Sequence, residues 1–345
     1  VPSIPRMNTK CKGNRAPEQK SGLTSSRRRG ITVWYNTDRG ARPVRKDSIT
    51  GTAGALAANC IFGLSYYFSR MALDTGTHPL VILQIRFTMA FIVLSLLAAP
   101  GAIRVRYRGK PLGRLLLMAV MQPLLYFIFE LYGIARTSTA LSGVIIGTVP
   151  AVVMLASALI LRERPTALQW AAGLLSVGCI AVISLIGQHN GTTDLAGILL
   201  LTGAVITAAG FNLCSRSVAA QFSAWERTYA MFAVAAAGFL VITPAVLRGQ
   251  YLPQLAAAVK QPRLWLAIAY LSLLSSIVAY WLYNHATGKI GLVRSSAFSA
   301  VITVVSMVTG IFILKEPMTP VQIALCLCII LCIYVVNRPT PAVSE

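Results

Sequence analysis

The sequence is poor in charged residues, and acidic ones are especially scarce. Asp and Glu total 10 against 31 Lys and Arg, and charged residues make up 12% of the chain, about half the share of an ordinary soluble domain. Hydrophobic residues reach 56%, and the mean hydropathy is +0.67. A water-soluble fold cannot hide this much apolar surface, because its exterior must contact water. The composition therefore predicts a protein that lies in a lipid bilayer.

Patterns typical of catalytic and metal sites are missing as well. The chain has three His residues, and neither an HExxH pattern nor a phosphate-binding glycine loop occurs. Six of the seven Cys residues lie in apolar runs, where a thiol behaves as a small hydrophobe, and their spacing suits neither a metal finger nor a redox pair. We therefore expect no enzyme, no catalytic residue, no metal and no cofactor. An intramembrane enzyme and a non-transporting scaffold or channel are the alternatives from other classes.

Residues 1–48 form a basic segment that differs from the rest of the chain. It holds 12 of the 31 Lys and Arg residues and has no hydrophobic periodicity. A disordered cytoplasmic tail near anionic lipid needs fewer assumptions than a nucleic-acid-binding arm, so no nucleic-acid partner is expected. No apolar stretch follows the charges within this segment, so we do not expect it to be a signal peptide. Because the chain opens with Val1, the alternative is a non-native extension.

Long apolar runs occupy the remaining sequence. A membrane-spanning helix needs about 20 mostly apolar residues. Ten stretches qualify and predict an all-α integral membrane protein with ten transmembrane helices: Thr52–Leu73, Pro79–Ala99, Leu112–Gly133, Ala140–Leu161, Leu168–Ile186, Leu195–Ser215, Arg227–Leu247, Leu264–Tyr283, Gly291–Leu314 and Val321–Val336.

Lys and Arg in the short links predict the orientation. Basic residues gather in the links after the second, fourth and sixth stretches, which lie on the same side as the basic tail. Cytoplasmic links carry an excess of Lys and Arg, so both termini are predicted to be cytoplasmic in a multi-pass plasma-membrane protein. The link with Arg248, Lys260 and Arg263 runs against this rule.

The two halves of the chain share polar residues at fixed spacing. Six positions recur at an offset of 153: Leu161 and Leu314, Glu163 and Glu316, Thr166 and Thr319, Gln169 and Gln322, Cys179 and Cys332, Ile180 and Ile333. This predicts two five-helix repeats, residues 49–187 and 188–338, followed by a tail at 339–345. Because five is odd, the second repeat enters the membrane from the opposite face, an arrangement that transporters use for alternating access.

Several of these residues also carry a family resemblance. They are Asn59 followed by Phe62-Gly63, Arg86, and the Leu161-Arg-Glu163-Arg-Pro and Leu314-Lys-Glu316-Pro motifs. From Thr52 to Val336 the chain resembles the EamA-type transporters of the drug/metabolite transporter superfamily. The resemblance implies alternating access without ATP, frequent export of amino acids or other metabolites, and a central cavity lined by both repeats. Cys60-Ile61 departs from the Trp and Gly that relatives often have there.

Two ionisable residues within the predicted spans require a reason, because charge in the bilayer costs about 2.5–3.5 kcal/mol on insertion scales. Glu130 could bind a cationic substrate or exchange a proton, or it could have a structural partner. Arg86 could hold a substrate carboxylate through its planar fork or extend to the interface. We favour a third interpretation, an ion pair between Arg86 and Glu130 on adjacent helices.

Uncharged polar and aromatic residues complete the predicted substrate site. Each could line the cavity, bond across helices or, for the aromatics, belong to the interfacial belt. Asn59 and Asn212 lie at similar depth on repeat-related helices, which favours the cavity. The candidates beside Arg86 and Glu130 are Asn59, Tyr126, Asn212, Tyr280, Trp281 and Asn284.

Another set of residues is predicted to be structural or to act in gating. Glu163 and Glu316 each leave a helix beside Arg or Lys and suit a structural or gating pair. Gly143 and Gly147 form a GxxxG face, which favours helix packing within the chain over a homodimer. Pro150 follows one turn later and is expected to kink the helix.

The favoured function is therefore a secondary transporter that exports amino acids or related small metabolites, with proton coupling as an option. The runner-up is an efflux carrier for drugs or cationic compounds, supported by Glu130 and the aromatics.

Overall fold

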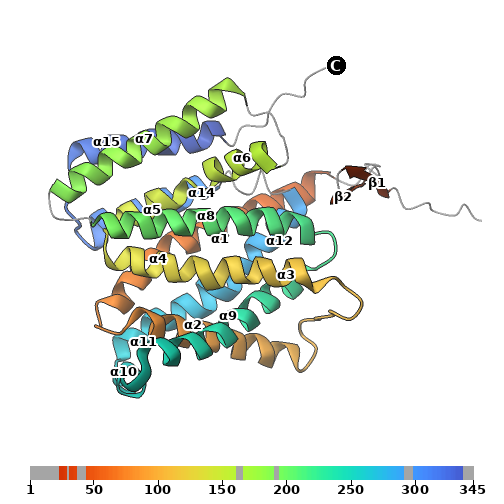
Figure 1. The fold of residues 1–345 in the computed structure, drawn as a ribbon, viewed down its shortest axis with the longest axis horizontal. Coiled ribbons are helices and arrows are strands. Elements are labelled where there is room, and N and C mark those ends of the chain that lie inside the picture. Colours follow the sequence, from red (N-terminus) through yellow and green to blue (C-terminus); the bar gives the residue numbers. More distant parts are fainter. Residues whose placement is uncertain are drawn as a thin grey trace, which may run out of the picture. The chain divides into compact units, whose positions relative to one another are not determined.

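The computed structural model describes residues 23–28, 31–36, 44–160, 166–189, 194–290 and 298–336. Helices follow the predicted apolar stretches closely (Figure 1). In the first half they are α1 (Val44–Leu73), α2 (Pro79–Ala98), α3 (Leu112–Ala119), η1 (Val120–Leu125), α4 (Tyr126–Ala135), α5 (Thr139–Gly147), α6 (Val149–Ile160) and α7 (Ala167–His189). In the second half they are α8 (Leu195–Val218), α9 (Ala224–Leu247), η2 (Arg248–Gln250), α10 (Tyr251–Val259), α11 (Pro262–Ala269), η3 (Tyr270–Ala279), α12 (Tyr280–Ile290), α14 (Ser299–Val308), η4 (Thr309–Ile313) and α15 (Pro320–Val336).

A helix and a pair of strands were not expected. The helix α10 lies in the link after the predicted seventh span, where its apolar residues follow a helical period. In the predicted tail, β1 (Leu23–Arg28) and β2 (Ile31–Asn36) pair antiparallel. The sequence analysis did not predict these two strands, and most of the remaining tail lies outside the described residues.

The helices have the length and composition of membrane spans. Six continuous helical stretches in the described residues are long and apolar enough to cross a bilayer, and three apolar helices are shorter. Large apolar side chains point outward along them, and Leu159 and Phe312 are 76% and 74% exposed. In water such exposure would be costly, whereas lipid is as apolar as these side chains. The chain is therefore a multi-pass membrane protein.

Polar side chains satisfy the free backbone groups where helices begin. His78 and Ser138 accept hydrogen bonds from Leu80 N and Leu141 N at the starts of α2 and α5. Ser223 and Glu226 form a capping box at the start of α9. These bonds matter because the first four N–H groups of a helix have no partner within it.

Two helical stretches are interrupted at mid-length by the π-helical segments η1 and η3, and a third stretch ends in the π-helical segment η4. Within η1, Gln122 leaves the helical conformation (φ −149°, ψ 121°) immediately before Pro123. A further break separates α5 from α6 at Thr148, two residues before Pro150, whose ring nitrogen cannot donate to the preceding turn. Such interruptions re-aim side chains and occur often at functional sites.

The GxxxG face of α5 packs within the chain. A Cβ at Gly143 would overlap the side chain of Ser306, and one at Gly147 would overlap Thr303, both on α14. Thr303 Oγ1 donates to the Gly143 carbonyl at 3.3 Å. Because Gly143 and Gly147 have no side chain, the backbones of α5 and α14 can approach closely. This face is buried and is not free to bind a second copy of the chain.

We predict that Gly143→Ala lowers the stability of the purified protein by about 1–3 kcal/mol, because the added methyl group overpacks the contact with Ser306. The measurement is thermal unfolding in detergent. Gly178→Ala on α7 is the matched control, since a Cβ there meets no atom within 4 Å. Equal melting temperatures for the two variants would refute the close-packing account.

Candidate functional site

A cavity of about 780 Å³, including its part open to solvent, lies among helices from both halves of the chain. Its wall is largely aromatic and aliphatic, with a few polar groups that converge. The polar and aromatic lining residues are Asn59, Phe62, Ser65, Tyr66, Gln122, Tyr126, Phe127, Glu130, Phe211, Asn212, Ser275, Tyr280, Tyr283 and Ser299.

Glu130 provides the only carboxylate among the described lining residues, which include no Lys, Arg or His. Its side chain is 4% exposed and accepts a hydrogen bond of 2.7 Å from the Tyr126 hydroxyl, one turn earlier on α4. The phenol of Tyr66 on α1 is a second nearby partner. Both partners are phenols and not cations, so the hydrogen-bonding capacity of the carboxylate is supported without an ion pair. The wall can therefore attract a cationic group.

Amide side chains occupy matched positions on the two halves. Asn59 Nδ2 on α1 donates to Ala55 O at 2.7 Å, and Asn212 Nδ2 on α8 donates to Ala208 O at 2.8 Å. Each bond reaches back one helical turn, and both side chains line the cavity. The Tyr283 hydroxyl donates to Asn212 Oδ1 at 3.1 Å. Both Asn residues thus lie where the sequence predicts them.

Gln122 and Tyr280 connect the two broken helices across the cavity. Gln122 Nε2 donates to the Tyr280 hydroxyl at 2.6 Å, joining η1 to the start of α12. The Tyr280 ring also meets Phe62 edge-to-face, with centroids 5.0 Å apart. The sequence analysis predicted Tyr280 and missed Gln122. A polar residue next to a proline inside an apolar run would have been the signal.

Arg86 lies behind the cavity wall and not in it. Its guanidinium donates to Ser276 Oγ and Ser275 Oγ, at 3.1 Å each, and lies 4.3 Å from the Phe127 ring centroid. Among the residues that the structure describes, the ion pairs with a nitrogen–oxygen distance below 4 Å are Lys110–Glu226 and Arg136–Asp194. The predicted Arg86–Glu130 ion pair is therefore wrong, because α2 directs Arg86 at η3. Ser275 and Phe127 do line the cavity, so Arg86 is one layer away.

Trp281 and Asn284 lie outside the cavity. Trp281 stacks between Trp225 and His285, with ring centroids 5.2 and 5.4 Å away. Asn284 Nδ2 donates to Thr228 Oγ1 at 3.1 Å on α9. These side chains join α12 to α9 and do not line this cavity, and their role in substrate binding stays a prediction.

Glu316 acts as a helix cap. Its carboxylate accepts hydrogen bonds from the backbone N–H groups of Thr139 (2.6 Å) and Ala140 (2.9 Å) at the start of α5. It forms no ion pair with Lys315 within the described residues, contrary to the pairing suggested by their proximity in sequence. A carboxylate at a helix N-terminus is favoured by the helix dipole.

Two other residues were predicted to be structural or to act in gating. Glu163 lies outside the described residues, and Pro150 lines the cavity.

Tyr66, Phe62 and Ser65 are lining residues that the sequence analysis did not select. On α1 they lie on the cavity side together with Asn59: Phe62 follows Asn59 by three residues, Ser65 by six and Tyr66 by seven. That periodicity would have identified Phe62 and Tyr66.

Comparisons with known proteins agree with this architecture. The EamA-like transporter family model matches twice, over residues 49–185 and 195–338. The uncharacterized transporter YcxC of Bacillus subtilis (strain 168) is 32% identical over 287 residues, covering 80% of this chain and 89% of that protein. A probable terminal-alkyne amino-acid exporter of Streptantibioticus cattleyicolor is 24% identical, covering 69% of this chain and 77% of that protein.

A solved crystal structure shares the fold, with a TM-score of 0.59 at 17% identity over 83% of this chain and 96% of that one. The family model covers most of the chain, and it includes every residue that lines the cavity. On this evidence the chain belongs to the EamA-like transporter family.

Proposed function

We propose that this transporter exports amino acids or related small metabolites across the plasma membrane by alternating access, without ATP. The observation that carries the proposal is Glu130, a buried carboxylate in an aromatic cavity that helices from both halves enclose. The name of the related exporter from Streptantibioticus cattleyicolor supports the substrate class and the direction. Both termini are assigned to the cytoplasm from the basic links.

Alternating access here rests on two inverted five-helix repeats, and matching local geometry supports them. At the start of α7, Thr166 N and Oγ1 donate to Gln169 Oε1 at 2.9 and 3.2 Å. At the start of α15, Thr319 donates to Gln322 Oε1 in the same way and at the same distances. The twofold match of the family model gives independent support.

Helix packing supports the same symmetry. The equivalent helices pack on each other as α2 with α9, α5 with α14, and α7 with α15. Gly133 of α4 lies against Leu201 of α8, while Gly54 of α1 lies against Leu282 of α12. When a two-fold axis relates two halves, a helix near the axis packs on its own equivalent. A contact between two other helices then recurs between their equivalents. With five spans in each half, we assign ten spans to the chain.

The chemistry of the cavity suits a zwitterion. The carboxylate of Glu130 attracts an ammonium group, and the aromatic rings around it add cation–π attraction. Ser275 presents a hydroxyl in front of the Arg86 guanidinium, which favours a substrate carboxylate on that wall. Glu130 thus favours the ammonium group of an amino acid, and Ser275 with Arg86 favours its carboxylate.

One observation favours the runner-up, an efflux carrier for cationic compounds. Glu130 has no cationic counterpart among the described lining residues. A cation without a carboxylate would then bind as well as an amino acid does. A channel or an enzyme would differ from both in kinetics, because only a carrier shows saturable flux that substrate on the far side accelerates.

We predict that cysteines at Arg164 and Pro317, in a background without native cysteines, react from opposite sides of the membrane. The links that hold them are equivalent in inverted repeats. The measurement is labelling of intact cells with an impermeant maleimide, before and after permeabilisation. Cysteines at Arg108 and Asp74 are the references for the two sides. Labelling of positions 164 and 317 from the same side would exclude the inverted arrangement.

We predict that cells overexpressing the protein enrich the medium in an amino acid or a close derivative. In proteoliposomes, that compound should accelerate its own counterflow, while the amine that lacks its carboxylate should not. The reason is that the Ser275 hydroxyl, which is polarised by Arg86, has no substrate carboxylate to bind when the ligand is an amine. Transport of the amine at an equal or higher rate would favour the cationic-compound carrier.

We predict that Glu130→Gln abolishes transport driven by a pH gradient and leaves substrate exchange intact, because the amide cannot take up the coupling proton. Counterflow with and without a pH difference measures both activities. Asp74→Asn is the control, since this carboxylate is exposed in the link between α1 and α2. Unchanged dependence on the gradient in Glu130→Gln would reject proton coupling at this residue.

A further inference from the structure

The link between α2 and α3 alternates apolar and basic residues. Ile103 is buried and Val105 and Tyr107 are half-buried, while Arg104, Arg106 and Arg108 are exposed. Successive side chains of an extended segment point to opposite sides. The link therefore lays its apolar residues on the helices and presents three guanidinium groups on its other side.

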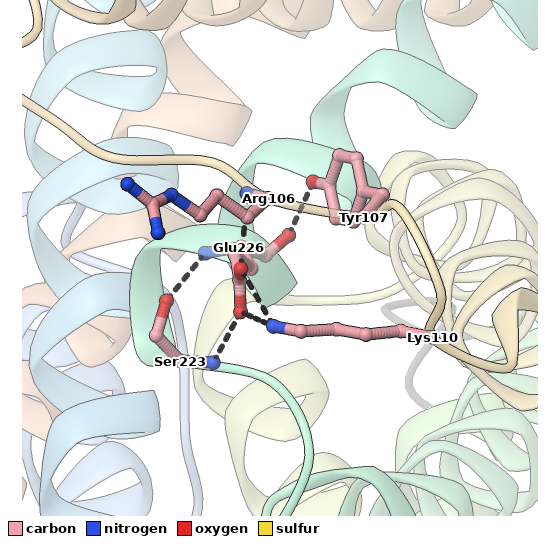
Figure 2. A network of polar contacts seen from close by, with 5 residues as sticks. All are labelled: Arg106, Tyr107, Lys110, Ser223 and Glu226. Carbon is pink, nitrogen blue, oxygen red and sulfur yellow. Dashed lines mark hydrogen bonds and ion pairs between the residues drawn. The ribbon is translucent and has the colours of Figure 1, made fainter.

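Glu226 at the start of α9 holds this link in place (Figure 2). Its carboxylate accepts from Lys110 Nζ at 2.7 Å to both oxygens, from Arg106 N at 3.0 Å and from Ser223 N at 2.8 Å. The Tyr107 hydroxyl donates to the Glu226 carbonyl at 2.7 Å. Burial and the nearby Glu226 raise the pKa of Tyr107, which therefore stays a neutral donor. The link is held as a preorganised surface.

The carboxylate of Glu226 neutralises Lys110 but leaves Arg104 and Arg106 without a carboxylate partner among the described residues. In Figure 2 the guanidinium of Arg106 points away from the carboxylate that binds its backbone. Neither Arg104 nor Arg106 has a carboxylate within 4 Å among the residues that the structure describes. Both arginines line an open pocket together with Lys110, Phe222 and Trp225. The pocket has a positive edge and an apolar edge.

The pocket lies at the height of the lipid headgroups. It is formed where α2, α8 and α9 end or begin, and the apolar stretches Pro79–Ala98, Leu195–Ser215 and Ala224–Val259 are each long enough to span the hydrocarbon. The ends of such spans meet the interface, where tryptophans such as Trp225 concentrate. A lipid phosphate is thus the anion nearest to Arg104 and Arg106.

We propose that this pocket binds the phosphate headgroup of an anionic phospholipid. Arg104 and Arg106 hold the phosphate, and Trp225 contacts the upper part of the acyl chains. Free phosphate shares the headgroup chemistry but cannot use the apolar edge. A specific lipid would hold together the ends of α2 and α9, which pack on each other.

The test is native mass spectrometry of the purified full chain, titrated with dioleoyl phosphatidylglycerol or dioleoyl phosphatidylcholine. The wild type should prefer phosphatidylglycerol, and R104Q/R106Q should bind it roughly tenfold to thirtyfold more weakly, given the usual contribution of a basic residue near an anionic lipid surface. K260Q/R263Q removes the same charge from exposed positions in the link before and at the start of α11 and should bind like the wild type.

Three results would overturn the proposal. One is equal weakening in both double variants, which would mean diffuse charge attraction. Another is displacement of the lipid by excess inorganic phosphate, which would assign the pocket to a soluble anion. The third is a wild type without preference for phosphatidylglycerol over phosphatidylcholine, a result that holds even if R104Q/R106Q fails to fold.

Discussion

Hydrocarbon offers no hydrogen bonds, so every polar group that this chain carries into the membrane must find its partner in the protein. The carboxylate of Glu130 is supported by Tyr126, and the guanidinium of Arg86 by Ser275 and Ser276. Glu316 uses the free N–H groups of α5 in the same manner. Each of these groups is satisfied by uncharged donors or acceptors of the protein, and no ion pair is needed.

The cavity depends on breaks in the helices that surround it. Gln122 lines the wall because the backbone departs from the helix there, and Ser275 belongs to the π-helical segment η3. A continuous α-helix would direct its carbonyl groups along its own axis and leave few polar groups for a ligand. Interrupted helices give up local hydrogen bonds and expose polar groups at mid-membrane depth, where soluble metabolites need them.

Much of the fold could be predicted from the sequence, because lipid requires long apolar runs and the links are rich in turn residues. Asn59, Tyr126, Glu130, Asn212 and Tyr280 could also be found, as polar or aromatic groups at mid-span. The partner of Arg86 could not, since spacing along the chain does not tell which helix faces it. Trp281 and Asn284 were selected as an aromatic and a polar group within the span. Residue type does not tell that their side chains face α9, whereas Tyr280 and Tyr283 face the cavity.

The bond between Glu316 and α5 joins a residue of the second half to a helix of the first. Two hydrogen bonds to a half-buried carboxylate separate readily only when other donors, such as water, replace them. If the halves part at this end, water must enter the seam between Glu316 and Thr139 as the gap forms. The wetting of that seam then contributes to the activation barrier, so the rate of the conformational cycle would depend on how readily a few water molecules reach one carboxylate.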